Sequence, residues 1–249
     1  MGEVLLSAQG LTKRFGGLTA VNGVSLDLWR GHIHAVIGPN GAGKSTLTNL
    51  LAGDLTPTSG TVTLNGHDVT GCSLEKISRR GLGRSYQKTN IFLPFTVWDN
   101  VRLAAQSRTP HALRWLSRAN GFAAVNERAS HAIALAGLQA RTNVVAGTTS
   151  HGEQRQLEIA MALATDPQVL LLDEPLAGMG VAEAERMVDL LQRIKPAHAI
   201  MLVEHDMDAV FALADRLTVM VNGHVIATGT PPQVRADANV QSAYLGEEH

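Results

Sequence analysis

Several features are scarce in this 249-residue sequence. It has one cysteine, Cys72, only 4% aromatic residues and a formal net charge of -1. A single cysteine excludes a disulfide scaffold and is typical of a reducing compartment. The near-neutral charge gives no global basic field, so strong binding to nucleic acid is not expected.

Long hydrophobic runs are absent as well. Runs such as 169–172 and 199–203 are far shorter than the roughly 20 residues that a membrane helix needs. The first residues lack the basic start and apolar stretch of a secretory signal, so none is expected. Hydrophobic residues nevertheless make up 45% of the chain, which excludes a disordered protein. The length fits one large domain, or a domain with an inserted lobe, and is enough to bury a real core. If the protein works at a membrane, another component must hold it there.

The order of the apolar patterns predicts an α/β fold. Strands are expected at 24–28, 32–37, 61–66, 169–172 and 199–203, with a closing hairpin at 217–227. Helices are expected at 44–52, 97–105, 124–136, 187–194 and 207–214. Alternating strands and helices indicate a largely parallel sheet with helices on its faces. Residues 96–137 are rich in Ala, Leu and Arg, and we interpret them as a helical lobe inserted into this core.

The clearest motif is a glycine-rich loop, Gly38-Pro39-Asn40-Gly41-Ala42-Gly43-Lys44-Ser45. It fits the phosphate-loop pattern G-x-x-x-x-G-K-[ST] and lies between a predicted strand and a predicted helix, as the pattern requires. Glycines let backbone N–H groups converge on a phosphate, and the helix N-terminus adds about half a positive charge. Lys44 can reach the β and γ phosphates, and the Ser45 hydroxyl can bind Mg²⁺. The alternative is a glycine-rich turn before an ordinary helix.

A second motif follows the buried strand at 169–172. Asp173 and Glu174 stand where α/β sheets place their ligands, and Pro175 stops the strand. Asp173 would hold Mg²⁺, directly or through water. Glu174 would point the other way along the strand and orient or deprotonate a water that attacks a γ-phosphate. The alternative is an acidic residue that caps the next helix.

A third motif, Thr149-Ser150-His151-Gly152-Glu153-Gln154, precedes a predicted helical face. Ser150 is a good N-cap, and Gly152 leaves backbone N–H groups open to an anion. In isolation this pattern favours an ordinary capped helix. Its position shortly before the acidic strand end, however, resembles that of the L-S-G-G-Q signature motif in ABC-transporter ATPases. With the phosphate loop upstream, the resemblance extends over the whole chain.

The resemblance implies a P-loop NTPase core of RecA-like α/β architecture, with an N-terminal antiparallel β subdomain and an inserted α-helical subdomain. One ABC ATPase domain would span 1–249. The core and β subdomain would occupy 1–88 and 156–230, the helical subdomain with the signature motif 89–155, and a helical tail 231–249. The implied cofactors are ATP and Mg²⁺, and two subunits would sandwich two ATP molecules.

The family's functional residues fall on matching positions. Phe15 would stack on adenine, and the other residues around ATP would be Gly38, Pro39, Asn40, Gly41, Ala42, Gly43, Lys44, Ser45 and Thr46. The catalytic residues would be Lys44, Gln87, Glu174 and His205, and the Mg²⁺ ligands Ser45, Gln87 and Asp173. The partner's ATP would face Ser150, His151, Gly152, Glu153 and Gln154. From the residues alone, Phe15 also fits an ordinary core position, and Gln87 an ordinary surface position.

Four departures from the family pattern are informative. Thr149 replaces the signature leucine, His151 the first signature glycine and Glu153 the signature glutamine, and Gly180 stands where the D-loop aspartate is usual. The segments that carry them, together with 157–159, 173–179, 203–207 and the tail at 243–246, resemble the branched-chain amino acid uptake subfamily, whose relatives handle urea or short amides. The expected partners are two membrane permeases, a solute-binding protein and a second, identical or different, ATPase subunit. The expected location is peripheral, on the cytoplasmic face of the inner membrane.

Two other functions compete with import. A soluble ABC ATPase acting on nucleic acid or the ribosome usually has two cassettes or long coiled coils, which this chain lacks. A P-loop kinase would leave the signature motif without a use. Separately, the apolar segment 92–95 fits either the core of the helical lobe or a groove for a permease helix.

Overall fold

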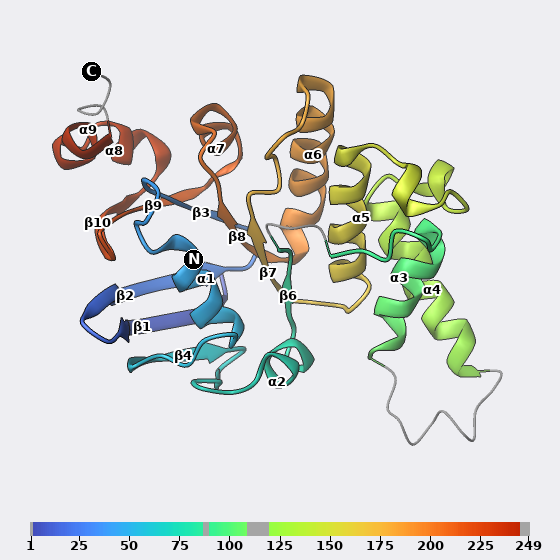
Figure 1. Cartoon of the computed structure of the whole chain (residues 1–249), viewed down its shortest axis with the longest axis horizontal. Helices are drawn as coiled ribbons and strands as arrows, with labels where there is room; N and C mark the ends of the chain where they lie inside the picture. The colour runs from blue at the N-terminus through green and yellow to red at the C-terminus, as the bar shows by residue number, and fades with distance from the viewer. Residues whose placement is uncertain (1, 87–89, 109–119, 245–249) are drawn as a thin grey trace. The chain divides into compact units, whose positions relative to one another are not determined.

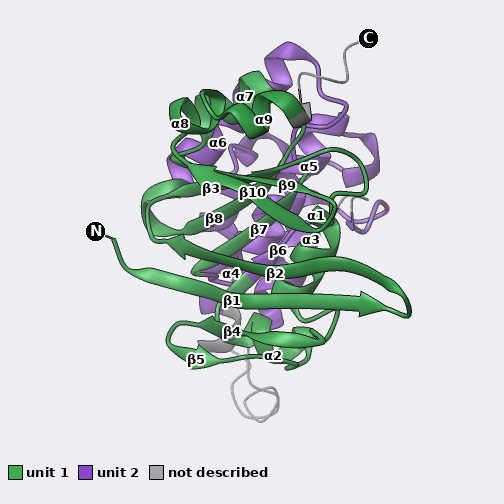
Figure 2. Cartoon of the chain, turned by 90° about the vertical axis from the view of Figure 1, so that its left-hand side faces the viewer, with its two compact units in different colours: residues 1–82, 168–174, 195–249 green, residues 83–167, 175–194 purple. Residues whose placement is uncertain are grey.

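The computed structural model describes residues 2–86, 90–108 and 120–244 (Figure 1). The chain divides into two compact units, shown in green and purple in Figure 2. Unit 1, the α/β unit, contains Met1–Leu82, Gln168–Glu174 and Lys195–His249. Unit 2, the helical unit, contains Gly83–Pro167 and Pro175–Ile194.

The first sheet of the α/β unit is antiparallel. Its strands are β1 (Val4–Phe15), β2 (Leu18–Trp29), β4 (Ser59–Leu64) and β5 (His67–Asp68), in the order β2-β1-β4-β5. An Asn-Gly pair ends the strand predicted at 61–66 and is typical of a tight hairpin turn. It forms the β4–β5 turn, in which Asn65 and Gly66 have positive φ of 51° and 74°. Strand β1 was not predicted as a continuous strand, and register shifts interrupt its pairing with β2 between Ala8 and Arg14.

The second sheet has six strands in the order β10-β9-β3-β8-β7-β6. They are β3 (Ile33–Ile37), β6 (Leu82–Arg84), β7 (Val169–Asp173), β8 (Ala199–Val203), β9 (Arg216–Val221) and β10 (His224–Gly229). Pairings β7–β8, β8–β3 and β3–β9 are parallel, and β9–β10 is the predicted antiparallel hairpin. Strands β3, β7 and β8 are buried along their whole length, which confirms the prediction of central parallel strands.

Helix α1 (Lys44–Ala52) follows β3 with the predicted bounds. A left-handed Gly53 ends it, and its N–H donates to the carbonyl of Leu50. One apolar cluster joins α1 to inward side chains of β1, β2 and β4 and to side chains of β3, β7 and β8. Burial of both sheets against the same cluster therefore fixes the turn between β3 and α1, which holds the glycine-rich loop.

The remaining helices of the α/β unit are short. They are α2 (Leu74–Arg79), α7 (Met207–Leu213), α8 (Pro231–Arg235) and α9 (Ala238–Tyr244). The sequence predicts that α7 buries Met207, Val210, Phe211 and Ala214, which is only partly right. Helix α7 buries Val210 and Leu213 and ends before Ala214. Helices α8 and α9 lie in the segment predicted to be a helical tail.

The helical unit contains α3 (Val97–Gln106), α4 (Asn120–Leu135), α5 (His151–Leu163) and α6 (Val181–Ile194). Helix α3 packs against α4 and α5, and α5 contacts α6. Thr96 precedes the helix predicted at 97–105, where a threonine favours an N-cap, and its hydroxyl does accept a hydrogen bond from the Asp99 N–H. Pro110, which by its sequence position is expected to break this helix, lies outside the described residues.

The compact units do not coincide with the proposed subdomains. The sequence predicts a helical insertion at 89–155, whereas the helical unit begins at Gly83 and also contains Pro175–Ile194. The reason is that α6 packs on α5, a contact between segments far apart in the sequence. Over the part of the chain that the structure describes, no helix is both long and apolar enough to cross a membrane.

Candidate nucleotide-binding site

The loop between β3 and α1 has a backbone that only glycine accepts without strain. Gly38, Gly41 and Gly43 have φ of 156°, 81° and 99°. A Cβ at Gly38 would collide with the carbonyl oxygen of Met220, and one at Gly43 with that of Ala20. The loop is thus held closely against β9 and β2.

Hydrogen bonds hold the same loop in place. The Ala42 N–H donates to Pro39 (3.1 Å), and the Gly223 N–H, from the β9–β10 turn, donates to Ala42 (3.0 Å). The C-terminal hairpin therefore supports the loop directly. Pre-ordered backbone N–H groups at a helix N-terminus are the arrangement that binds phosphate.

Lys44 is the cation of this loop. Its ammonium donates to the carbonyls of Gly38 (2.6 Å) and Pro39 (3.0 Å). Burial lowers the pKa of Lys44, while the carboxylates of Glu174 and Asp173 act in the opposite direction. Lys44 of the phosphate loop is therefore close enough to Asp173 and Glu174 of the acidic strand end to interact with them electrostatically.

The two carboxylates follow β7. Asp173 is its last residue and is buried, whereas Glu174 has left the strand with φ of 48°. Strand alternation, from which the sequence predicts that Glu174 and Asp173 point in opposite directions, therefore does not apply to Glu174, because this residue lies outside the strand. Its N–H donates to Val203 at the end of β8 (2.9 Å). Left-handed geometry at a non-glycine residue is uncommon and concentrates at functional sites.

His205 follows β8 at the same edge of the sheet. Its Nδ1 lies 3.8 Å from Glu174 Oε1 and 3.9 Å from Oε2 of the buried Glu204. Its side chain is 65% exposed. Because β3, β8 and β7 are neighbouring parallel strands, their carboxyl ends bring Lys44, Glu174 and His205 to one edge, the usual ligand site of such sheets.

The proposed Mg²⁺ ligands fit that ion. Ser45 is exposed in the first turn of α1. Asp173 is the last residue of β7, and its carboxylate, like that of Glu174, raises the pKa of Lys44. Among the described residues no cluster of three or more His, Cys, Asp and Glu side chains forms a metal cage. Mg²⁺ is usually held by one or two protein oxygens together with phosphates and water, so a hydroxyl and a carboxylate suit it. Gln87 lies outside the described residues.

Phe15 ends β1 and is 47% exposed, so it is not the core residue that the sequence also allowed. The Lys13 ammonium lies 5.2 Å from its ring centroid. An exposed ring beside a cation offers a flat surface for a base.

The signature segment opens α5 in the helical unit. Ser150 and Glu153 form a reciprocal capping box, with Ser150 Oγ accepting from the Glu153 N–H and the Glu153 carboxylate accepting from the Ser150 N–H. Arg141 donates to Glu153 (2.8 Å), and the Gln154 amide donates to the Thr149 carbonyl (3.3 Å). The cap predicted from the sequence is thus confirmed in detail.

Two buried charged residues of the helical unit carry no signal in the sequence. Arg155 and Glu158, on the second turn of α5, form an ion pair of 3.1 Å with side chains only 6% exposed. Arg155 also donates to the Tyr86 carbonyl (2.7 Å), and Glu158 accepts from the Tyr86 N–H (2.9 Å). Burial raises the pKa of Glu158, although hydrogen bonds from the N–H groups of Tyr86 and Asn90 counteract it. These contacts join α5 to Tyr86, about 70 positions earlier in the sequence, so no pattern of neighbouring residues predicts them.

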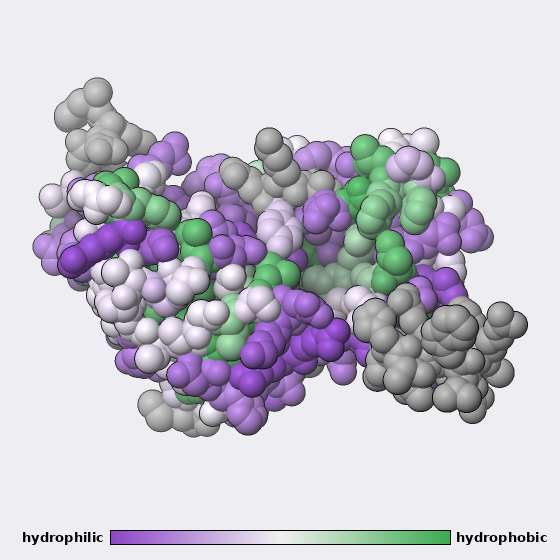
Figure 3. Space-filling model, turned by 60° about the horizontal axis from the view of Figure 1, so that its bottom comes forward, coloured by the Kyte–Doolittle hydropathy of each residue, from purple (hydrophilic) through white to green (hydrophobic). Residues whose placement is uncertain are grey.

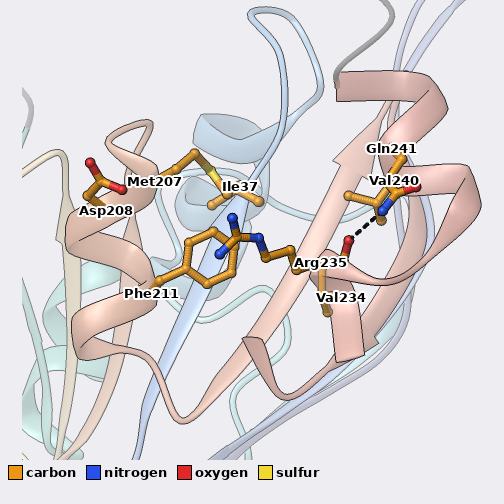
Figure 4. A pocket seen from close by; sticks show the side chains of 8 residues that line it. All are labelled: Ile37, Met207, Asp208, Phe211, Val234, Arg235, Val240 and Gln241. Carbon is orange, nitrogen blue, oxygen red and sulfur yellow. Dashed lines mark hydrogen bonds between the residues drawn. The ribbon is translucent and has the colours of Figure 1, made fainter. Parts of the chain in front are cut away.

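A cavity of about 260 Å³ lies elsewhere in the α/β unit (Figure 4). Apolar side chains of α7, α8 and α9 form much of its wall, and the Arg235 guanidinium stands over the Phe211 ring, 5.5 Å from its centroid. The Gln241 amide donates to the Arg235 carbonyl (3.0 Å). None of the residues predicted to bind ATP lines this cavity.

The fold and site define an ATP-binding cassette, and comparison with known proteins confirms the class. The family model described as ABC transporter matches residues 21–177, and the chain belongs to this family. A second model, described as branched-chain amino acid ATP-binding cassette transporter, matches residues 224–249.

Individual relatives narrow the class further. The chain is 38% identical to the high-affinity branched-chain amino acid transport ATP-binding proteins BraF of Pseudomonas aeruginosa and LivG of Escherichia coli K12. Each match covers 99% of this chain and 100% of the relative. The solved ADP conformation of the ABC-transporter cassette MJ1267 superposes with a TM-score of 0.86 at 28% identity, over 98% of this chain and 100% of that one.

Proposed function

We propose that this chain is the ATP-hydrolysing subunit of an ABC importer for branched-chain or other hydrophobic amino acids, or for urea or amides. The family, the C-terminal match and the two full-length relatives support this function. They do not favour a soluble ATPase acting on nucleic acid or the ribosome. The observation that carries the chemistry is the convergence of Lys44, Asp173, Glu174 and His205 at one sheet edge.

Each of these residues has a distinct role in hydrolysis. The loop N–H groups and Lys44 hold the β and γ phosphates and stabilise charge that develops on them. Glu174 orients the attacking water and accepts its proton, and His205 contacts the γ-phosphate from the next strand. Ser45, Asp173 and Gln87 would hold Mg²⁺, which neutralises phosphate charge when bound.

ATP also joins two subunits in this proposal. Phe15 stacks on adenine, while the partner subunit's signature segment covers the γ-phosphate. Support comes from the helix N-terminus at Ser150, where the Ser150 hydroxyl and the Gly152 N–H already donate to an anionic group, the Glu183 carboxylate. The second ATPase subunit is identical or different.

An exposed apolar patch on the helical unit supports a membrane partner. Phe92 and Phe95 stack with ring centroids 5.3 Å apart, and Leu93 and Val145 are exposed with them. Figure 3 shows hydrophobic side chains gathered at the upper right of the surface in that view. Exposed apolar clusters of this kind mark interaction sites. We propose that the patch receives a permease helix and holds the chain at the cytoplasmic face of the membrane, with a solute-binding protein delivering the solute.

Uptake in cells tests the importer function. Cells lacking the chain's own gene are supplied with the wild type or with Lys44→Ala, and uptake of labelled leucine, isoleucine, valine, urea and acetamide is measured. We expect the wild type to restore uptake of at least one of these solutes and Lys44→Ala to restore none. Restoration by both variants would refute the requirement for ATP, and restoration by neither would refute import of these solutes.

The patch has its own test. Phe92→Asp and Phe95→Asp are each compared with Leu18→Asp, which adds the same charge at an exposed apolar residue of the α/β unit. Co-purification with the permeases should fall for the patch variants and persist for the control. Intact assembly of both patch variants would refute the docking role.

A further inference from the structure

The carboxylate of Glu183 lies at the N-terminus of the signature helix α5. Ser150 Oγ donates to Glu183 Oε1 (2.6 Å), and the backbone N–H groups of Gly152 and Gly180 donate to the same carboxylate. These bonds lower the pKa of Glu183, chiefly through Ser150, so the group is charged at neutral pH. The start of α6 is thus joined to the start of α5.

Gly152 is what admits this carboxylate. A Cβ at Gly152 would lie 2.7 Å from Glu183 Cδ and 2.8 Å from Oε1, closer than carbon and oxygen atoms approach. The segment that leads into α6 also lies close to α5 at Gly178, where a Cβ would come within 3.6 Å of the His151 ring. The signature segment and the segment 178–183 therefore form one packed surface of the helical unit.

The donors that hold Glu183 are those proposed to hold a nucleotide. A serine hydroxyl, a glycine N–H and a helix N-terminus form an anion site, and here the anion is a side chain of the same chain. Two anions close to one set of donors repel each other. A γ-phosphate from the partner subunit's ATP and the Glu183 carboxylate therefore compete for Ser150 and Gly152.

We propose that Glu183 is a built-in competitor for the signature segment and sets the ATP concentration at which two subunits pair. This inference rests on the proposed function, because it assumes that the signature segment faces the partner's nucleotide. When the γ-phosphate arrives, the carboxylate leaves Ser150 and Gly152 and keeps its bond to the Gly180 N–H at the start of its own helix.

ATP-dependent pairing of the full chain tests the proposal. All variants carry Glu174→Gln, which slows hydrolysis, and dimer mass is followed by light scattering while ATP and Mg²⁺ are titrated. Glu183→Gln removes the charge with little change of shape, and Glu183→Ala removes the group. The matched control is Glu185→Gln, the same change at an exposed site two residues along α6.

Glu183→Gln should lower the ATP concentration for half-maximal dimer on the order of tenfold, the factor expected for losing one charge-assisted competitor. Glu185→Gln should leave it unchanged. Weaker or unaltered pairing of Glu183→Gln relative to Glu185→Gln would overturn the proposal and make the carboxylate a cap of α5 only. If either Glu183 variant does not fold, Glu183→Asp keeps the charge but shortens the reach to Ser150, and it should also lower the ATP requirement.

The outcomes separate this inference from the proposed function. If the Glu174→Gln background binds ATP but never dimerises, nucleotide-driven pairing itself fails. If that background dimerises and the Glu183 substitutions do not ease pairing, only the role of Glu183 fails.

Discussion

The phosphate loop offers a comparison between two of its glycines. Gly41 and Gly43 have φ of 81° and 99°, so alanine at either position costs about 1–2 kcal/mol of backbone strain. Their surroundings differ. Nothing lies within 4 Å of a Cβ at Gly41, whereas a Cβ at Gly43 would collide with the carbonyl of Ala20 in β2.

The collision at Gly43 makes the loss of unfolding free energy larger there than at Gly41. A strand carbonyl cannot rotate away as a flexible side chain can, so Gly43→Ala adds an overpacking cost of about 1–3 kcal/mol. The expected loss of unfolding free energy is about 2–5 kcal/mol for Gly43→Ala and about 1–2 kcal/mol for Gly41→Ala. Because Gly43 caps α1, its displacement also moves the N–H groups that would hold phosphate.

Urea unfolding measures the first effect, and titration with a fluorescent ATP analogue and Mg²⁺ the second. We expect Gly43→Ala to weaken nucleotide binding on the order of tenfold more than Gly41→Ala, as a difference of about 1.4 kcal/mol requires. Equal losses for the two variants in both assays would refute the argument that close packing against β2 shapes the loop.

Three further predictions concern stability and base recognition. Burial lowers the pKa of His34 from 6.5 to about 4, so as the pH falls the unfolded chain takes up a proton at this residue before the folded chain does. The stability that neutral His34 contributes is complete above pH 6.5 and falls by about 3 kcal/mol toward pH 4. Urea unfolding should show this loss in the wild type and not in His34→Gln. Glu158→Ala breaks a buried ion pair and should cost about 3–5 kcal/mol, against less than about 1 kcal/mol for Glu75→Ala in an exposed pair; similar losses in denaturant melts would contradict this. Phe15→Ala should weaken ATP binding on the order of tenfold while Leu18→Ala, also exposed, does not; unaltered affinity would remove Phe15 from the base site.

Local signals were enough for the parts of the fold that local chemistry controls. The bounds of α1 were predicted because Gly43 and Gly53 adopt left-handed conformations at its two ends. Strand β8 was predicted because a short apolar run covered on both sides has few alternatives. The Ser150–Glu153 capping box follows from two residues three positions apart.

Long-range contacts explain what the sequence did not show. Strand β1 depends on pairing with β2 and β4 across register shifts, and no regular alternation marks it. Glu158 meets Tyr86 across 72 positions, and Glu183 meets Ser150 across 33. The direction of Glu174 depends on a left-handed backbone that strand periodicity cannot anticipate. The residues of the candidate site were therefore predictable as types, whereas the contacts that tune them were not.

The most direct measurement is phosphate release by Glu174→Gln beside the wild type, with ATP binding measured on the same samples. Glu174 lies at the sheet edge with Lys44 and His205, and glutamine keeps its shape but cannot accept a proton. The account predicts bound ATP and a loss of turnover on the order of 10²–10⁴-fold, the range that general base catalysis supplies. Hydrolysis within a few-fold of wild type would show that Glu174 is not the base.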